Sequence, residues 1–274
     1  DERQVFDYIR NGKYSSVIHL AAKVGGIKAN TDYVGDFYTE NSKMNINVLH
    51  SSMLCDVKKV VSLLSTCVYP DNVKYPITEN QLHLGPPHSS NFGYAHAKRM
   101  LEVQSRAYRK QYGCDFVCAI PNNLYGENDN YHLENSHVIP ALTRKIYEAK
   151  LHNKNKVEVW GNGSPLREFT YSGDIADILV HILNNNTPEL LNIGTIKEVS
   201  IQQLVNLLCE ILEYDGEIFW NTEMPNGQHR KPSSNSLLIE SGWDSKHYTQ
   251  LKDGLKKTCD WFVNRYPIIR GIEN

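Results

Sequence analysis

A tyrosine and a lysine four residues apart, Tyr94 and Lys98, lie in the segment FGYAHAK at residues 92–98. On a helix this spacing puts the two side chains on one face. A cation beside a phenol favours the phenolate, so we expect the tyrosine to exchange a proton with a carbonyl or alcohol oxygen nearer neutrality than its ordinary pKa of about 10 allows. The simpler interpretation is an exposed helix pair that contributes only about 0.3 kcal/mol.

Small and hydroxyl-bearing residues follow the apolar runs that come before this pair and after it. The run VVSLL at residues 60–64 ends in Ser65, Thr66 and Cys67. Similar strand ends are HLAAKVGG at residues 19–26 and PNNLYG at residues 121–126. Chemistry in an open parallel sheet occurs at the carboxyl ends of its strands, and small residues there let a flat ligand approach the backbone. Ordinary turns are the alternative for the glycines.

Short apolar runs alternate with amphipathic stretches along the chain, which predicts βαβ units and a parallel sheet. Strands are expected at residues 16–20, 59–64 and 115–120, and shorter ones at 157–160, 190–193 and 217–220. Helices are expected near residues 1–9, 35–55, 92–112, 137–150, 172–185, 200–213 and 247–264, with a capping box at Ser200 and Gln203. Polar loops are expected at residues 184–186 and 226–228. The short later strands predict a second, smaller domain folded against the first.

The bulk composition is that of a globular protein. The chain has 274 residues, of which 41% are hydrophobic and 22% charged, and its formal net charge is −2. These values exclude broad attraction to nucleic acid, and no run approaches the ~20 apolar residues that span a bilayer. Six cysteines without a C-x-x-C pair predict free thiols in a reducing compartment, the cytoplasm, and no metal site.

Five motifs in the chain resemble the extended short-chain dehydrogenase/reductase family and, within it, the GDP-L-fucose synthase family. They are AKVGGI at residues 22–27, STCVYP at 65–70, NFGYAHAKRM at 91–100, NSHVIPAL at 135–142 and WGNGSPLREF at 160–169. The resemblance implies an α/β fold, with a Rossmann-type doubly wound parallel sheet at residues 1–124 that binds NADP(H). Residues 125–274 would form mainly a smaller α+β substrate domain, with some later segments returning to the first domain.

The resemblance also implies a two-stage reaction. GDP-4-keto-6-deoxy-D-mannose is epimerised at C3 and C5, and NADPH then reduces its 4-ketone to give GDP-L-fucose. In the reduction, Tyr94 would give a proton to the ketone oxygen, Ser65 would hydrogen-bond that oxygen, and Lys98 would support Tyr94 and hold the nicotinamide ribose.

Epimerisation requires two acid/base groups on opposite faces of the sugar. The family uses a cysteine and a histidine, and the matching positions are Cys67 and His137. Considered alone, Cys67 is typical of a small buried hydrophobe and His137 of an ordinary polar residue. Together with their flanking motifs, they separate this interpretation from simple sugar-nucleotide 4-epimerases, which do not need a second acid/base pair.

The remaining ligand contacts follow from the resemblance alone. Arg167 and Lys231 would meet the diphosphate, where Lys145 replaces an arginine of some relatives, and Asn123 would add a hydrogen bond. Val138, Leu142 and Trp160 would line the guanosine site. The cofactor would contact the following set: Ala21, Ala22, Lys23, Tyr94, Lys98, Pro121, Asn123, Leu124 and His137. Without the resemblance, most of these residues are typical of a solvated surface or a core.

One feature of the family is missing from the 274 residues. The family opens with a strand, a turn of the G-x-x-G-x-x-G type and a helix that receives the cofactor pyrophosphate. We therefore expect this Rossmann sheet to be N-terminally incomplete and the chain by itself to bind cofactor weakly. Two alternatives remain: a catalytically impaired sugar-nucleotide binding module, and a related sugar-nucleotide epimerase or reductase. By resemblance we also expect a homodimer built on the helices at residues 35–55 and 92–112.

Overall fold

The computed structural model describes residues 1–224 and 229–272, apart from the side chain of Ile27. The expected polar loop at residues 226–228 lies outside the described residues. Chain contacts divide the protein into two compact units. Unit 1 comprises Asp1–Asn122, Ile175–Gly194 and Ser233–Ser245, and unit 2 comprises Asn123–Asp174, Thr195–Pro232 and Lys246–Asn274.

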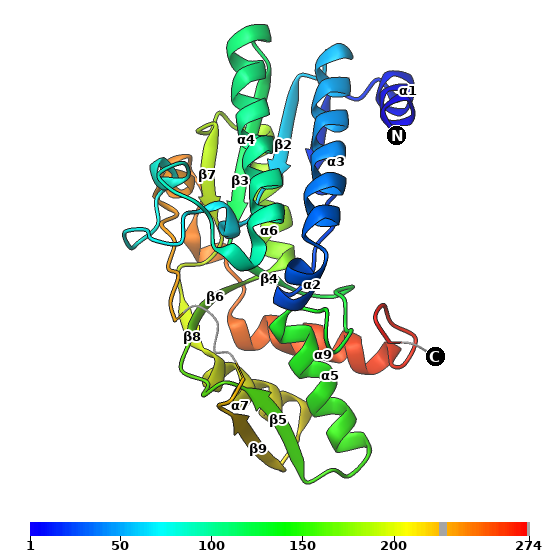
Figure 1. Cartoon of the computed structure of the whole chain (residues 1–274), viewed down its shortest axis with the longest axis vertical. Helices are drawn as coiled ribbons and strands as arrows, with labels where there is room; N and C mark the ends of the chain where they lie inside the picture. The colour runs from blue at the N-terminus through cyan, green and yellow to red at the C-terminus, as the bar shows by residue number, and fades with distance from the viewer. Residues whose placement is uncertain (225–228, 273–274) are drawn as a thin grey trace. The chain divides into compact units, whose positions relative to one another are not determined.

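Helices and strands alternate along the chain (Figure 1). The helices are α1 Glu2–Gly12, α2 Ile27–Asp32, α3 Val34–Leu54, α4 Phe92–Tyr112, α5 Val138–Leu151, α6 Ser172–Asn184, α7 Ile201–Leu212, α8 Ser236–Glu240 and α9 Leu251–Arg265. The strands are β1 Ser16–His19, β2 Lys59–Leu63, β3 Asp115–Pro121, β4 Asn123–Tyr125, β5 Lys156–Trp160, β6 Leu166–Tyr171, β7 Leu190–Ile193, β8 Glu198–Ser200 and β9 Glu217–Asn221. The predicted helices and strands are therefore confirmed to within a few residues at their ends.

Unit 1 is built on a parallel sheet with the strand order β1-β2-β3-β7. Its central strands are mostly apolar, as expected where helices cover a parallel sheet: Val60, Val61, Phe116 and Ile120 are buried. Figure 1 shows α3 and α4 running side by side along this sheet. Gly93 permits their close contact, since a Cβ atom at this position would lie 2.6 Å from the main-chain oxygen of Val34.

Strand β7 belongs to this sheet, where Ala119 is in register with Leu191. Residues 190–193, which the spacing of the short strands grouped with the second domain, are one of the later segments that return to the first domain. A four-residue apolar run carries no information about its partner strand. The partner is decided by the crossover through α6, which returns the chain to a position beside β3.

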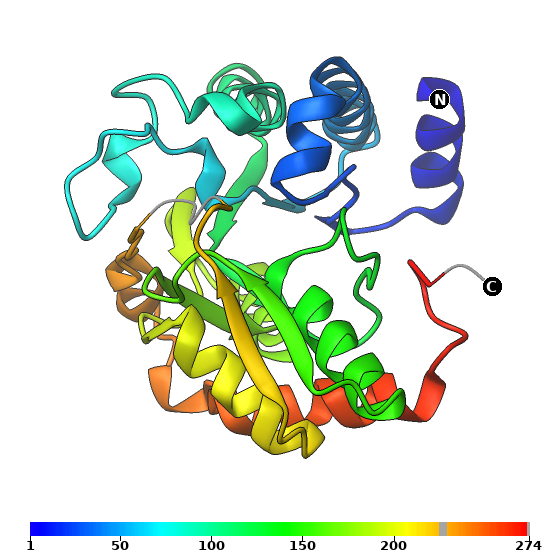
Figure 2. The same cartoon turned by 60° about the horizontal axis from the view of Figure 1, so that its bottom comes forward.

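Unit 2 contains two small sheets and three main helices. The sheets have the orders β4-β6-β8 and β5-β9. Helix α7 packs against α5 and α9, and α5 also contacts β5, as Figure 2 shows. The core of unit 2 includes Ile146, Leu204 and Leu208. The predicted capping box at the start of α7 is present, since Ser200 and Gln203 exchange side-chain to backbone hydrogen bonds.

Strands β4, β6 and β8 were not predicted from the sequence. β4 and β8 have three residues each, and β6 carries Arg167 and Glu168 within its six residues. Such short or charged segments give little periodic signal. No helix in the described part of the chain combines the length and the apolar character needed to cross a membrane.

Candidate active site

The segment after β2 forms a tight turn that presents Ser65 and Cys67. Ser65 is extended and caps a 3₁₀ turn at Thr66–Val68, and its Oγ accepts a hydrogen bond of 3.4 Å from the backbone N–H of Cys67. Both residues are half-buried, whereas Val68 is fully buried. The turn thus places a hydroxyl and a thiol together at the carboxyl end of a central strand.

Helix α4 carries Tyr94 and Lys98 on the same face, as their spacing predicted. The Lys98 Nζ lies 5.9 Å from the centre of the Tyr94 ring. It also donates a hydrogen bond of 2.7 Å to the main-chain oxygen of Leu63, the last residue of β2. Lys98 is only 2% exposed, so this pair is not the exposed helix pair of the simpler interpretation.

The ionisation of Tyr94 differs from the sequence-based expectation. Burial raises the pKa of Tyr94 far above its usual range, and the nearby Cys67 raises it further. Burial also lowers the pKa of Lys98 to about 8, against opposing contributions from Cys67 and Cys118. Because burial and Cys67 both disfavour the phenolate, the phenol keeps its proton at neutral pH and is suited to act as a proton donor.

Buried asparagines fix the elements around this pair. His19, at the end of β1, lies with its Nε2 3.0 Å from Asn45 Oδ1, and Asn45 Nδ2 donates to the main-chain oxygen of Ala97 over 3.1 Å. Burial lowers the pKa of His19 to about 4, so its ring is neutral near pH 7. Asn45 therefore connects β1, α3 and α4 immediately beside Lys98.

The loop after β1 is held to α3 in a similar way. Asn41 Oδ1 accepts from the backbone N–H of Lys23 over 3.0 Å, and Asn41 Nδ2 donates to the Lys23 carbonyl over 3.0 Å. The Lys23 Nζ lies 2.6 Å from Glu40 Oε1. Ala21 is exposed and Ala22 half-buried. Sequence reasoning missed Asn41 and Asn45; their i, i+4 spacing within a long helix was the available signal.

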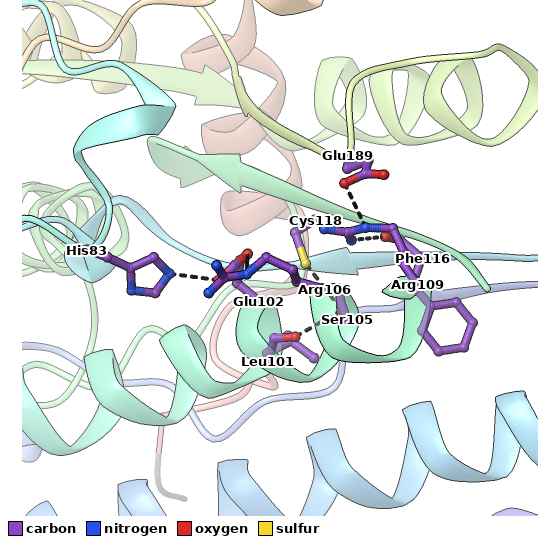
Figure 3. Close-up of polar contacts among 9 residues, drawn as sticks. All are labelled: His83, Leu101, Glu102, Ser105, Arg106, Arg109, Phe116, Cys118 and Glu189. Carbon is purple, nitrogen blue, oxygen red and sulfur yellow. Dashed lines mark hydrogen bonds and ion pairs between the residues drawn. The ribbon is translucent and has the colours of Figure 1, made fainter. Parts of the chain in front are cut away.

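The C-terminal half of α4 is anchored to β3, to the loop before α4 and to the segment before β7 (Figure 3). Glu102 is 4% exposed, and its carboxylate lies 2.7 Å from His83 Nε2 and 3.1 Å from Arg106 Nε. Arg109 donates to the main-chain oxygen of Phe116 and pairs with Glu189 over 2.8 Å. These contacts fix the position of α4, and therefore of Tyr94, relative to the sheet.

Unit 2 holds the predicted imidazole. His137 is exposed and immediately precedes α5, where it is the N-cap residue without a side-chain cap bond. Asp129 faces it: burial raises the pKa of Asp129, and the charges of His137 and Arg270 act in the opposite direction. Asn123 is exposed on β4 and donates to the main-chain oxygen of Glu168 over 2.9 Å, and Leu124 beside it is half-buried.

Several of the predicted nucleotide contacts also lie in unit 2. Trp160 is 51% exposed at the end of β5, and the Lys145 Nζ lies 5.6 Å from its ring centre. Val138 is exposed at the start of α5, whereas Leu142 is 4% exposed and belongs to the core of the unit. Arg167 Nη1 donates to the main-chain oxygen of Leu166 over 2.7 Å.

The predicted residues are thus divided between the two units. Unit 1 brings Ser65, Cys67, Tyr94 and Lys98 together. Pro121, in the same unit, is buried at the end of β3. Ala21, Ala22 and Lys23 also belong to unit 1. The other predicted residues belong to unit 2, including Lys231, which is half-buried.

Comparison with known proteins identifies the family of this arrangement. Residues 1–194 match the family model described as the NAD dependent epimerase/dehydratase family. The chain is 43% identical over 266 residues to GDP-L-fucose synthase of Dictyostelium discoideum, covering 96% of this chain and 82% of that protein. It is 36% identical over 281 residues to GDP-L-fucose synthase of Escherichia coli K12, covering 99% and 87%.

A solved structure agrees with the sequence matches. The crystal structure of a GDP-L-fucose synthetase from Naegleria fowleri bound to NADP superposes with a TM-score of 0.92 and 36% identity, covering 98% of this chain and 83% of that one. The fold is therefore shared over nearly the whole chain. The chain belongs to the NAD dependent epimerase/dehydratase family and, within it, to the GDP-L-fucose synthase family.

Proposed function

We propose that the protein converts GDP-4-keto-6-deoxy-D-mannose to GDP-L-fucose, by epimerisation at C3 and C5 followed by NADPH-dependent reduction of the 4-ketone. The observation that carries this proposal is the packing of the Ser65–Cys67 turn against the Tyr94 and Lys98 face of α4. The turn supplies a thiol that a simple 4-epimerase does not need. The chain matches most of the length of the GDP-L-fucose synthases, which supports this substrate over the substrates of related epimerases. The same matches support an enzyme over a binding module.

The residues of unit 1 fit a nicotinamide cofactor. The buried Lys98 ammonium has three donors, and its hydrogen bond to Leu63 uses one of them. The others are available to ribose hydroxyls, and the small residues Ala21 and Ala22 allow a flat ring to approach. NADP(H), when bound, supplies the hydride that reduces C4. Lys23, Pro121, Asn123, Leu124 and His137 would complete its contacts.

In the reduction, Tyr94 gives its proton to the ketone oxygen as that oxygen gains negative charge. Burial keeps the phenol protonated until then, since its pKa is raised. Ser65 donates a hydrogen bond to the same oxygen and holds the carbonyl in place. Lys98 contributes positive charge beside the developing phenolate.

In the epimerisation, one group removes the proton from the carbon beside the carbonyl and another returns a proton to the opposite face. We assign Cys67 and His137 to these roles. The electrons of the broken C–H bond move onto the carbonyl oxygen as an enolate, which Ser65 and Tyr94 stabilise by hydrogen bonds. Reprotonation at carbon then re-forms the ketone with inverted configuration.

Unit 2 supplies the nucleotide contacts of this proposal. Exposed Trp160 and Val138, together with Leu142 of the unit 2 core, would provide an apolar wall for guanine. Arg167, Lys145 and Lys231 provide cations for the diphosphate. Lys145 replaces an arginine of some relatives, so it supplies charge without a bidentate fork.

The test uses GDP-4-keto-6-deoxy-D-mannose and NADPH with purified protein. We expect Tyr94→Phe to lower the rate of ketone reduction by about 100- to 10,000-fold. Tyr108→Phe is the matched control, since Tyr108 lies on the same helix and its hydroxyl contacts His50. Normal reduction by Tyr94→Phe would exclude its role as proton donor.

The epimerase pair has a separate readout. Cys67→Ser and His137→Asn should each abolish the incorporation of solvent deuterium at C3 and C5 of the sugar, in the absence of NADPH. Cys209→Ser, a half-buried cysteine of α7, serves as the control. Undiminished exchange in both variants removes the pair from the mechanism.

We further propose a homodimer built on α3 and α4. Their solvent-facing surface carries large exposed apolar side chains, Ile46 (55%), Met100 (51%) and Phe92 (49%), and Gln104 of α4 contacts the backbone of Ile46. Ile46→Glu with Met100→Glu should yield a monomer by light scattering. Ile196→Glu, equally exposed in unit 2, should leave the dimer intact.

The cysteines support a cytoplasmic location as part of this proposal. All six are free thiols, and Cys118 and Cys259 are buried. Imaging of a fluorescent fusion in cells tests this assignment.

A further inference from the structure

Arg99 of α4 is a buried cation next to the proposed active site. It is 8% exposed, and its Nε donates to the main-chain oxygen of Val68 over 2.5 Å. Its Nη2 is buried without a hydrogen-bond partner in the part of the chain that the structure describes. A buried guanidinium with unused donors is costly unless negative charge lies nearby.

The adjacent residues Lys98 and Arg99 hold the two ends of the turn that carries Cys67. Lys98 donates to the carbonyl of Leu63, before the turn, and Arg99 donates to the carbonyl of Val68, immediately after Cys67. The backbone on both sides of Cys67 is therefore attached to a cation of α4. Neither cation forms an ion pair with a carboxylate among residues 1–224 and 229–272.

Most titratable groups that interact with this turn or with its two cations come from α4; in addition, Cys118 of β3 interacts with Lys98, and Tyr69 directly follows the turn. Tyr94, Lys98 and Arg99 interact electrostatically with Cys67, and His96 interacts with Arg99. Burial lowers the pKa of Arg99, and the negative charge that Cys67 can carry acts in the opposite direction. The thiolate is thus the counter-charge that the structure offers to this guanidinium.

We propose that Arg99 is a positioning residue for epimerisation: it fixes the Cys67 turn and stabilises the Cys67 thiolate in the form that removes a proton from the sugar. This inference rests on the proposed catalytic role of Cys67. The thiolate takes the proton from the carbon beside the ketone and becomes a thiol, while the C–H electrons pass to the carbonyl oxygen. Arg99 stays protonated throughout.

A purely structural role would require only the hydrogen bond to Val68. The two roles differ in the ionisation of the thiol, because a neutral side chain that still reaches Val68 would keep the turn in place but would not stabilise the thiolate. Arg99→Gln is such a variant, and Arg99→Lys keeps the charge without the planar fork.

The experiment measures alkylation of Cys67 by iodoacetamide across pH in the full chain, with peptide mass spectrometry to separate it from the other cysteines. We expect Arg99→Gln to raise the midpoint of Cys67 alkylation by about one pH unit. Arg99→Lys should stay close to the wild type. Arg106→Gln on the same helix is the control, since Arg106 is 58% exposed and pairs with Glu102.

Circular dichroism confirms that each variant is folded, and Arg99→Met provides a second neutral variant should Arg99→Gln not fold. A midpoint that does not move in a folded neutral variant overturns the inference. Solvent exchange into the sugar by Cys67→Ser reports separately on the catalytic role. If that exchange persists while the alkylation midpoint still shifts, the proposed role of Cys67 fails and the electrostatic role of Arg99 stands.

Discussion

The Lys98 ammonium donates a hydrogen bond of 2.7 Å to the main-chain oxygen of Leu63, which ties the helix of Tyr94 to the end of β2. This bond offsets part of the cost of burying a charge, but burial still lowers the pKa of Lys98 to about 8. The folded protein thus retains a cation at a cost in stability, at the position where the proposed chemistry needs one.

Lys98→Met should remove a defined pH dependence of stability. Between about pH 8 and the usual lysine pKa of about 10.4, the unfolded chain binds more protons than the folded one, so this group makes stability rise with pH. We expect the free energy of unfolding of the wild type, relative to Lys98→Met, to increase by about 2–3 kcal/mol from pH 7.5 to pH 10. Urea denaturation at each pH measures this difference in the free energy of unfolding. A difference that stays the same from pH 7.5 to pH 10 would contradict the prediction.

His19 should make the protein sensitive to acid. Its folded pKa of about 4 lies below the usual value of about 6.5, so the unfolded chain binds the additional proton in this window. The stability is complete above about pH 6.5 and falls as the pH decreases towards 4. From pH 7 to pH 5 this group should cost about 2 kcal/mol. In denaturant titrations, the His19→Gln variant should lose this decrease in stability between pH 7 and pH 5. The His152→Gln variant, which changes an exposed histidine, should retain it.

Glu102→Gln should weaken the anchoring of α4. The buried carboxylate pairs with His83 and Arg106, and hydrogen bonds to charged groups contribute more than neutral ones (Figure 3). We expect a loss of about 1–2 kcal/mol in the free energy of unfolding. Asp260→Asn, in an exposed pair with Lys256, should change it by less than about 0.5 kcal/mol. Equal effects of the two substitutions would argue against a special role for the buried pair.

Trp160→Ala should weaken substrate binding with little effect on chemistry. If guanine packs on this exposed ring, its loss should raise the KM for the nucleotide sugar about tenfold and leave kcat within about twofold. Phe219→Ala is a matched control, because Phe219 is also exposed on the β5-β9 sheet and the centre of its ring lies 4.0 Å from the Nζ of a lysine, Lys156. Similar KM values in the two variants would remove Trp160 from the guanosine site.

The sequence by itself determined much of this protein. Helical spacing predicted the common face of Tyr94 and Lys98, and strand-end residues identified Ser65 and Cys67 as a candidate site. The parallel character of the first sheet and the helix boundaries also followed from periodicity. These features depend on residues that are close together in the sequence. The backbone geometry of helices and strands produces them wherever the same pattern of residues occurs.

Only the tertiary structure decided the rest. It placed β7 beside β3, buried Asn45 and Arg99 in contact with segments far away in the sequence, and raised the pKa of Tyr94 where spacing alone had favoured a lower value. Desolvation depends on everything packed around a side chain, and those atoms come from distant strands and helices. No pattern of adjacent residues specifies that environment.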